Sequence, residues 1–120
     1  MRQKFSRSSR IREGREFTLV REHGKSAQGR FLRVGFLNTL SSVNAKVGII
    51  TSKRVGGAVV RNKVRRRIRE LVRHSLSGMN PGLLVVVVAK PAAAGASFQE
   101  LEAEWAHLAR RLSLLPSSTA

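Results

Sequence analysis

The sequence predicts an α+β domain in which helices pack on one sheet, and three observations lead to that prediction. Residues 30–38 and 46–52 have the short, alternating or β-branched patterns of strands, and residues 83–89 (LLVVVVA) form an apolar, mostly β-branched run. Residues 58–76 and 97–112 repeat their apolar residues at three- and four-residue steps, as helices do. A chain of 120 residues has room for one domain, so we expect a single α/β sandwich with one sheet of about four strands and three helices.

The first predicted helix lies near the amino terminus. From Arg12 to His23, Phe17 and Val20 share one helical face. Gly24 follows at the position where a left-handed residue commonly ends a helix. We therefore expect a short helix that ends at His23.

The predicted strands differ in how they face the core. The apolar face of the strand at residues 30–38 consists of Leu32, Val34 and Phe36. Phe31 and Arg33 point the other way, which gives that face an aromatic ring and a cation. Only a short turn leads to the strand at 46–52, which favours antiparallel pairing of the two. The run at 83–89 is apolar on both faces, so we expect it in the middle of the sheet.

The last helix has the clearest start signal. Ser97 and Glu100 have the spacing of a capping box, and the apolar stripe that follows includes Trp105, which we assign to the core. Glutamates at its start and arginines at its end suit the helix dipole. We place the folded domain at residues 10–115, between a flexible basic arm at 1–9 and a frayed tail at 116–120.

The charge of the chain points to a polyanionic partner. Lysine and arginine total 23 against seven acidic residues, which gives a net charge of +16 and a pI near 12. Self-repulsion on that scale is most simply balanced by nucleic acid. An anionic membrane surface is the alternative, but the sequence has no lipidation signal, and its longest apolar run is far below the roughly 20 residues that a spanning helix needs. With neither a secretory signal nor cysteine, we expect a cytoplasmic protein without membrane contact.

The helix predicted at residues 58–76 has two unlike faces. Its apolar stripe consists of Val60, Val64, Ile68, Leu71 and Val72. The opposite side consists of Asn62, Arg65, Arg66, Arg69 and Arg73, with Arg61 and Arg67 at the borders. Glu70 is the helix's single acid, so the arginines do not form an intrahelical salt-bridge ladder. Their planar guanidinium groups suit phosphate, and the sequence predicts an RNA or DNA docking surface; a basic face kept for solubility is the alternative.

The segment before this helix extends the same surface. Lys53 and Arg54 add two cations, and Gly56 and Gly57 allow a phosphate backbone to approach the start of the helix. The whole stretch, SKRVGGAVVRNKVRRRIRE, resembles the signature of the bacterial ribonuclease P protein subunit, with Lys63 where the family usually has arginine. The sequence also resembles the family in RIREGREF, EHG, RF, VGIITSKRVG and VVVVAKPAA, which occur in the family's order between residues 10 and 110.

The resemblance implies a function and a fold. The family protein is a small basic partner of a catalytic RNA that removes the 5′ leader from precursor tRNA, and the RNA does the chemistry with bound Mg²⁺. We therefore expect a monomer in a one-to-one complex with the RNA subunit, Mg²⁺ held mainly by that RNA, and no organic cofactor. The implied fold is a sandwich related to a ribosomal protein domain, with a left-handed β-α-β crossover.

The resemblance also assigns residues to two sites. Contacts with the RNA subunit are implied for Lys53, Arg54, Arg61, Asn62, Lys63, Arg65, Arg66 and Arg69. A cleft for the precursor-tRNA leader is implied for Arg12, Phe17, Phe31 and Arg33. At two positions where relatives often have aromatic residues this chain has Arg21 and Val34, which shifts the expected cleft from base stacking toward attraction of the RNA backbone.

Two other functions remain open at the level of sequence. A ribosomal-type structural RNA-binding protein fits the same charge and is distinguished by which RNA it binds. A protein-only nuclease would need paired histidines or clustered carboxylates, but His23, His74 and His107 fall on three different elements and there is no aspartate. We therefore expect no catalytic residue and no metal site in the protein.

Overall fold

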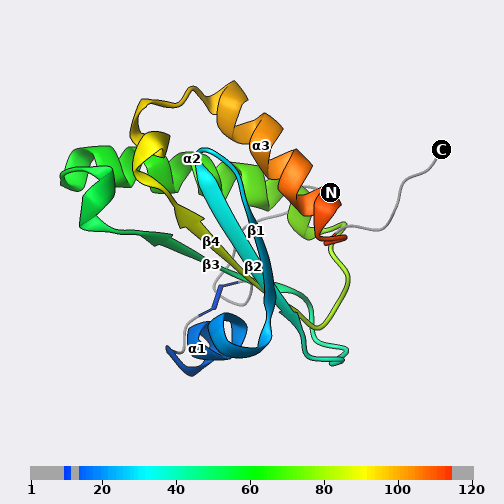
Figure 1. Cartoon of the computed structure of the whole chain (residues 1–120). Helices are drawn as coiled ribbons and strands as arrows, with labels where there is room; N and C mark the ends of the chain where they lie inside the picture. Colours follow the sequence, from blue (N-terminus) through cyan, green and yellow to red (C-terminus); the bar gives the residue numbers. More distant parts are fainter. Residues whose placement is uncertain (1–9, 12–13, 115–120) are drawn as a thin grey trace.

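A computed structural model describes residues 10–11 and 14–114 (Figure 1). The predicted arm at 1–9, the residues 12–13 and the predicted tail at 116–120 lie outside the described residues. The elements in chain order are α1 (Gly14–His23), β1 (Lys25–Gln28), β2 (Leu32–Asn38), β3 (Lys46–Thr51), the 3₁₀ turn η2 (Lys53–Val55), α2 (Ala58–Leu76), β4 (Leu83–Ala89), the 3₁₀ turn η3 (Pro91–Gly95) and α3 (Phe98–Arg111). The domain is α+β, as the sequence predicts.

The four strands form one mixed sheet in the order β1-β2-β4-β3. β2 is antiparallel to both β1 and β4, whereas β3 runs parallel to β4. The predicted antiparallel pairing of β2 with β3 is therefore wrong. β4 is apolar on both faces, and a strand buries the most apolar surface when it has a neighbouring strand on each side. β4 therefore occupies the position between β2 and β3. The helix α2 then forms the crossover that joins the parallel strands β3 and β4.

Helices cover both faces of this sheet (Figure 1). α2 and α3 lie on one face, over the larger core, which takes Leu83, Val85 and Val87 from β4. α1 lies on the other face, where Leu84 and Val86 form a smaller core with residues of α1 and with Ile11. The alternation along β4 confirms the prediction that this strand is buried on both sides.

α1 ends where the sequence predicts, but for a different physical reason. Gly24 does not have a positive φ, so the expected left-handed helix end is wrong. A Cβ at this position would lie 2.3 Å from the carbonyl oxygen of Phe36 and 2.5 Å from that of Val20. Gly24 is needed because the helix end passes this close to the backbone of β2.

The two longer helices match their predicted features closely. α2 has the predicted bounds, and its apolar stripe is buried except for Val60, which stays 37% exposed at the first turn. α3 begins with the predicted capping box, in which the Glu100 amide donates to Ser97 Oγ and the Ser97 amide donates to the Glu100 carboxylate. Trp105 is buried, and its Nε1 donates to Ser75 Oγ of α2 at 2.9 Å.

The strand β1 is absent from the predicted pattern. Its sequence, KSAQ, has only one apolar residue, and at the edge of the sheet it stays largely exposed. β1 is a strand because its backbone pairs with β2, from Lys25 opposite Phe36 to Gln28 opposite Arg33. A strand that depends on backbone pairing in this way is not predicted by the pattern of its side chains.

Candidate RNA-binding surfaces

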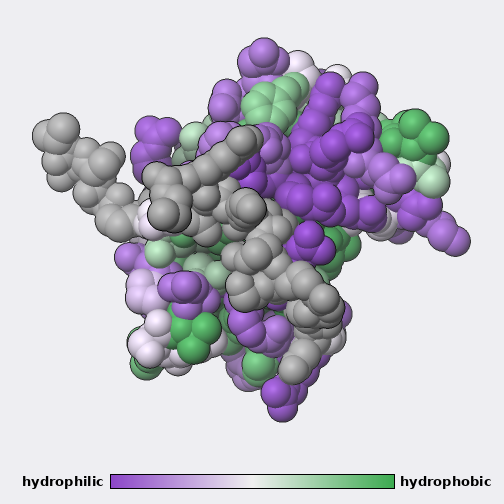
Figure 2. All heavy atoms as spheres, turned by 180° about the vertical axis from the view of Figure 1, so that it is seen from behind, coloured by the Kyte–Doolittle hydropathy of each residue, from purple (hydrophilic) through white to green (hydrophobic). Residues whose placement is uncertain are grey.

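The outer side of α2 forms a broad cationic surface, which we call the arginine face. It consists of Arg61, Asn62, Lys63, Arg65, Arg66 and Arg69. The buried stripe of Val64, Ile68 and Val72 fixes the helix on the sheet and directs these polar side chains outward. Seen from behind the view of Figure 1, hydrophilic side chains gather in a band over the part of the molecule that includes α2 (Figure 2). The two faces predicted for this helix are therefore present.

Arg65 of the arginine face donates hydrogen bonds to two uncharged side chains. Its Nη2 donates to Thr51 Oγ1 at 2.6 Å, and its Nη1 donates to Asn62 Oδ1 at 3.2 Å. Thr51 is the last residue of β3 and is buried. Because neither partner is charged, the guanidinium keeps its full positive charge while its orientation is restricted. Such a fixed guanidinium suits bidentate contact with a phosphate.

Arg69 lies in an environment that is unfavourable for a cation. Burial, together with the neighbouring guanidinium groups of Arg10 and Arg65, lowers its pKa. Its Nε is buried and has no hydrogen-bond partner among the described residues, and the same is true of Nε of Arg61. An anion at this surface would reduce the repulsion between the guanidinium groups. The electrostatics of the arginine face therefore favour phosphate.

The carboxyl end of α2 differs from the arginine face because it contains an acid. The Glu70 carboxylate accepts hydrogen bonds from Nε of Arg73 at 3.1 Å and from its Nη2. This pairing lowers the pKa of Glu70 and raises that of Arg73. His74 Nε2 lies 3.4 Å from the same carboxylate. Arg73 is therefore committed to a partner within the helix, unlike Arg65 and Arg69.

The start of α2 is open on the side of the cap. Gly57 is the N-cap residue and supplies no side chain to accept hydrogen bonds from the first turn, and a Cβ there would meet nothing within 4 Å. Lys53 and Arg54, in the preceding turn η2, are exposed. Gly56 has a φ of 151°, a conformation that favours glycine. Cations and unshielded helix amides thus lie next to each other, as the sequence predicts.

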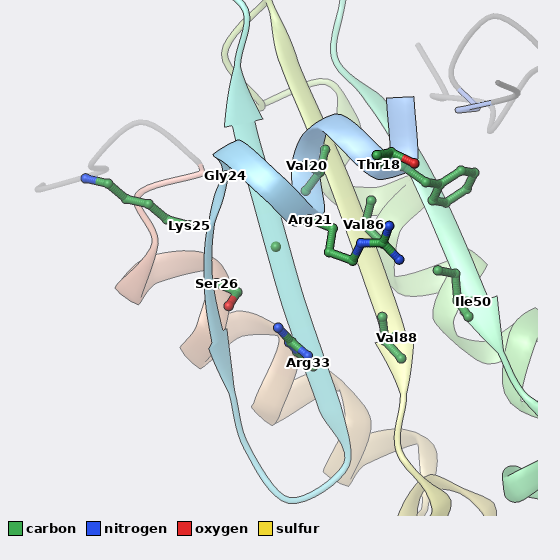
Figure 3. Close-up of a pocket in the computed structure, with 12 residues that line it drawn as sticks. Thr18, Val20, Arg21, Gly24, Lys25, Ser26, Arg33, Ile50, Val86 and Val88 are labelled. Carbon is green, nitrogen blue, oxygen red and sulfur yellow. The ribbon is translucent and has the colours of Figure 1, made fainter. Parts of the chain in front are cut away.

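A cleft lies on the other face of the sheet, beside α1. Its volume is about 200 Å³, and its apolar surface comes from α1 and from the sheet residues Ile50, Val86 and Val88. Arg21 extends from α1 across the cleft, Arg33 rises from β2 near Ser26, and Lys25 stands at the rim with its side chain directed outward (Figure 3). The cleft therefore combines an apolar floor with guanidinium groups.

Two of the four predicted cleft residues line this cleft. Phe17 lies against β3, so close that a Cβ at Gly48 would lie 2.5 Å from its ring. Arg33 is exposed on the strand face that the alternation of β2 predicts. Arg12 is outside the described residues.

Phe31 does not belong to the cleft, so the prediction that it shares a face with Arg33 is wrong. It precedes the first residue of β2 and does not follow the alternation of that strand. Its ring packs in the larger core on the opposite face of the sheet, with the Arg30 guanidinium 5.2 Å from the ring centroid. Val34 is fully buried in the same core, so it also takes no part in the cleft.

Lys25 and Ser26 line the cleft but are absent from the sequence-based prediction. Both belong to β1, the strand that the sequence pattern does not indicate. The polar sequence of residues 25–28, between a helix end and a strand, fits a loop as well as a strand, so the sequence pattern does not identify β1.

The cleft and the arginine face meet at β3. Ile50 lines the cleft, and the next residue, Thr51, accepts the hydrogen bond from Arg65. Successive residues of a strand point to opposite faces of the sheet, so adjacent positions serve the two surfaces. The surfaces are separated only by the thickness of this edge strand.

Comparison with known proteins decides the family. The family model for ribonuclease P matches residues 5–113. The chain belongs to the ribonuclease P protein family. It is 39% identical over 111 residues to the ribonuclease P protein component of Acidothermus cellulolyticus, covering 91% of this chain and 92% of that protein. It is 40% identical over 95 residues to the component of Beutenbergia cavernae, covering 79% of this chain and 80% of that protein.

Solved structures of ribonuclease P proteins have the same fold. The Staphylococcus aureus protein superposes with a TM-score of 0.83 at 25% identity, covering 91% of this chain and 99% of that one. The Thermotoga maritima protein has a TM-score of 0.74 at 26% identity, covering 85% and 96%. Membership makes this chain a component of an endoribonuclease of tRNA 5′ processing, in partnership with the ribonuclease P RNA.

The described part of this ribonuclease P protein contains no group of three or more His, Asp or Glu side chains placed to hold a metal ion. Within the same residues, no helix is long and apolar enough to cross a membrane. The features that distinguish the surface are its cations and its cleft.

Proposed function

We propose that this ribonuclease P protein assists RNA-catalysed removal of the 5′ leader from precursor tRNA by binding two RNAs at once. The RNA subunit would lie on the arginine face and the single-stranded leader in the cleft. The junction at β3 supports this most strongly, because Ile50 and Thr51 link the cleft directly to Arg65. A leader in the cleft would therefore enter at the edge of the catalytic RNA.

The chemistry of the arginine face supports a role in phosphate binding. The proposed contacts are Lys53, Arg54, Arg61, Asn62, Lys63, Arg65, Arg66 and Arg69. Arg65 is held in place by uncharged partners, and Arg69 has a buried Nε that lacks one. Lys63 supplies a point charge rather than a fork, so its contact is less directional.

The lining of the cleft supports binding of a single RNA strand mainly through its backbone. Phe17 is the one aromatic ring among the lining residues, whereas Arg21 and Arg33 both reach into the space. Stacking of a base contributes about 1–3 kcal/mol, so a cleft with one ring stacks little, and its cations attract phosphates of any sequence. We expect leader binding to depend strongly on salt and weakly on base identity.

Magnesium fits the RNA better than this surface. Mg²⁺ prefers oxygen ligands and usually needs carboxylates or phosphates. Glu70 is the acid of α2, and its carboxylate is already paired with Arg73. We propose that the catalytic Mg²⁺ is held by RNA oxygens and that the protein contributes by neutralising the phosphates around the ion. In this proposal one protein monomer binds one RNA subunit.

Reconstitution with the cognate RNA subunit tests the proposal. We expect the protein to lower the Mg²⁺ concentration needed for cleavage and to favour precursor tRNA over mature tRNA in binding. The mature tRNA is the control because it lacks only the leader. Equal stimulation of binding to both would overturn the role of the cleft, and failure to bind the RNA subunit would overturn the role of the arginine face.

A further inference from the structure

The turn between β1 and β2 is held by a carboxylate from another element. Glu104 of α3 accepts hydrogen bonds from three consecutive backbone amides: Oε1 from Arg30 at 2.8 Å, and Oε2 from Phe31 at 2.7 Å and from Leu32 at 2.6 Å. These residues lie more than 70 positions before Glu104 in the chain. Because the partners are so far apart in the chain, this contact is a product of the tertiary structure.

Lys90 completes the same arrangement from the end of β4. Its Nζ donates to the carbonyl oxygen of Gly29 at 2.9 Å and to Gln28 Oε1 at 3.2 Å. Its backbone amide donates to the carbonyl oxygen of Phe31 at 2.8 Å. The polar groups of the turn are thus bound to two side chains that belong to other elements.

The helix that carries Glu104 is anchored in the larger core. The neighbouring residue, Trp105, is buried and bonded to Ser75 of α2. Leu101 and Leu108, on the same side of α3, are completely buried. The carboxylate is therefore held in place by the larger core, and it transfers that order to the turn.

The turn leads directly into two walls of the cleft. Arg33, whose guanidinium lies in the cleft, follows the last clamped amide, that of Leu32. Lys25 and Ser26 lie on β1, the other strand of the hairpin. β1 is an exposed edge strand with one partly buried apolar residue, Ala27, so little side-chain packing holds it. Fixing the turn is therefore the main restraint on β1 beyond its pairing with β2.

We infer that Glu104 is a positioning residue for the leader cleft: its carboxylate fixes the β1–β2 turn and so holds Arg33, Ser26 and Lys25 where a leader strand binds. This inference rests on the proposed function of the cleft. It assigns to α3, which lies on the opposite face of the sheet, an effect on leader binding that is separate from binding of the RNA subunit.

Two variants disturb this contact in different ways. Glu104→Gln keeps the size of the side chain but replaces one acceptor oxygen with an NH₂ group, which would face backbone donors. Gly29→Ala leaves Glu104 intact, but its Cβ would lie 2.4 Å from the Glu104 carboxylate and push it away. Glu102→Gln is the matched control, because Glu102 is exposed on the same helix and the charge change is identical.

The measurements are made on the holoenzyme assembled with the cognate RNA subunit. We expect Glu104→Gln and Gly29→Ala to reduce the preference for precursor over mature tRNA by about tenfold, which equals the loss of roughly one charge-assisted contact. Affinity for the RNA subunit and its salt dependence should stay unchanged, as should all properties of Glu102→Gln. Amide hydrogen exchange at residues 30–32 should become faster in both variants.

Each outcome decides a different statement. Faster exchange at residues 30–32 with an unchanged leader preference would overturn the positioning role. Unfolding of both variants would also overturn it, because Glu104 would then be needed for the stability of the whole domain. A wild-type holoenzyme without any leader preference would overturn the proposed function of the cleft itself. Loss of RNA-subunit affinity in step with leader preference would indicate general damage and contradict the inference.

Discussion

Replacing Arg65 with alanine tests the arginine face most directly. Arg65 is held by Thr51 and Asn62 without an acidic partner, so its charge is available to RNA. Loss of one phosphate contact should flatten the slope of log affinity against log salt by about 0.7–0.9. Loss of a charge-assisted hydrogen bond of about 1.5–3 kcal/mol weakens binding roughly 10- to 150-fold at low salt. The lost bond from the guanidinium to Thr51 contributes about 1.5–3 kcal/mol to folding, which is less than the total stability of about 5–15 kcal/mol of a typical domain, so the variant should remain folded.

The assay is the affinity of the protein for the RNA subunit over a series of salt concentrations, with circular dichroism to confirm the helix content. Arg110→Ala is the matched control, because Arg110 is exposed on α3 and its loss changes the net charge equally. An equal change of slope in both variants would mean that total charge, rather than the position of Arg65, governs binding. Weaker binding with an unchanged slope would mean that Arg65 acts on the structure alone.

Three further changes probe the core, the cleft and the end of α2. Val64→Asp buries an unpaired charge in a site that is 2% exposed and should cost more than about 4 kcal/mol, enough to abolish far-UV dichroism; a folded variant would contradict the assigned stripe. Gly48→Ala should displace the ring of Phe17, at a cost of about 1–3 kcal/mol, and weaken leader binding more than RNA-subunit binding, which paired affinity measurements distinguish. The hydrogen bond from Arg73 lowers the pKa of Glu70 in the folded protein. The pair therefore stabilises the fold fully above the pKa that Glu70 has in the unfolded chain, about 4.3, and this stabilisation is lost as the pH falls through the lower pKa of the folded protein. Glu70→Gln should therefore flatten the acid limb of the urea midpoint against pH, and an unchanged limb would show that the pair does not contribute.

The elements that the sequence predicts correctly are those whose residues meet the core in a regular pattern. Val64, Ile68 and Val72 recur on one side of α2, so the helix and its cationic side follow from spacing alone. Ser97 and Glu100 fix the start of α3 through local hydrogen bonds. Local chemistry of this kind needs no information about the rest of the chain.

The errors concern partners that lie far apart in the sequence. The alternation of β2 does not extend to Phe31, because that residue belongs to a turn shaped by Glu104 and Lys90. The short connection favours pairing of β2 with β3, yet β4 lies between them in the sheet. Which strands become neighbours depends on how all the strands compete for the buried positions of the sheet. The residue pattern of one strand does not contain that information.

Residue spacing and charge suffice to predict a basic α+β domain with one helix that is apolar on one side and cationic on the other, and the residues of that helix carry the resemblance to the family. The surroundings of the cleft arise only from folding: the edge strand β1, the reach of Arg21, the exclusion of Phe31 and the carboxylate of Glu104 on the turn. The two kinds of feature differ in the sequence distance between the residues that form them. Helix faces and caps arise from residues a few positions apart, whereas the cleft is assembled from elements that meet only when the sheet has formed.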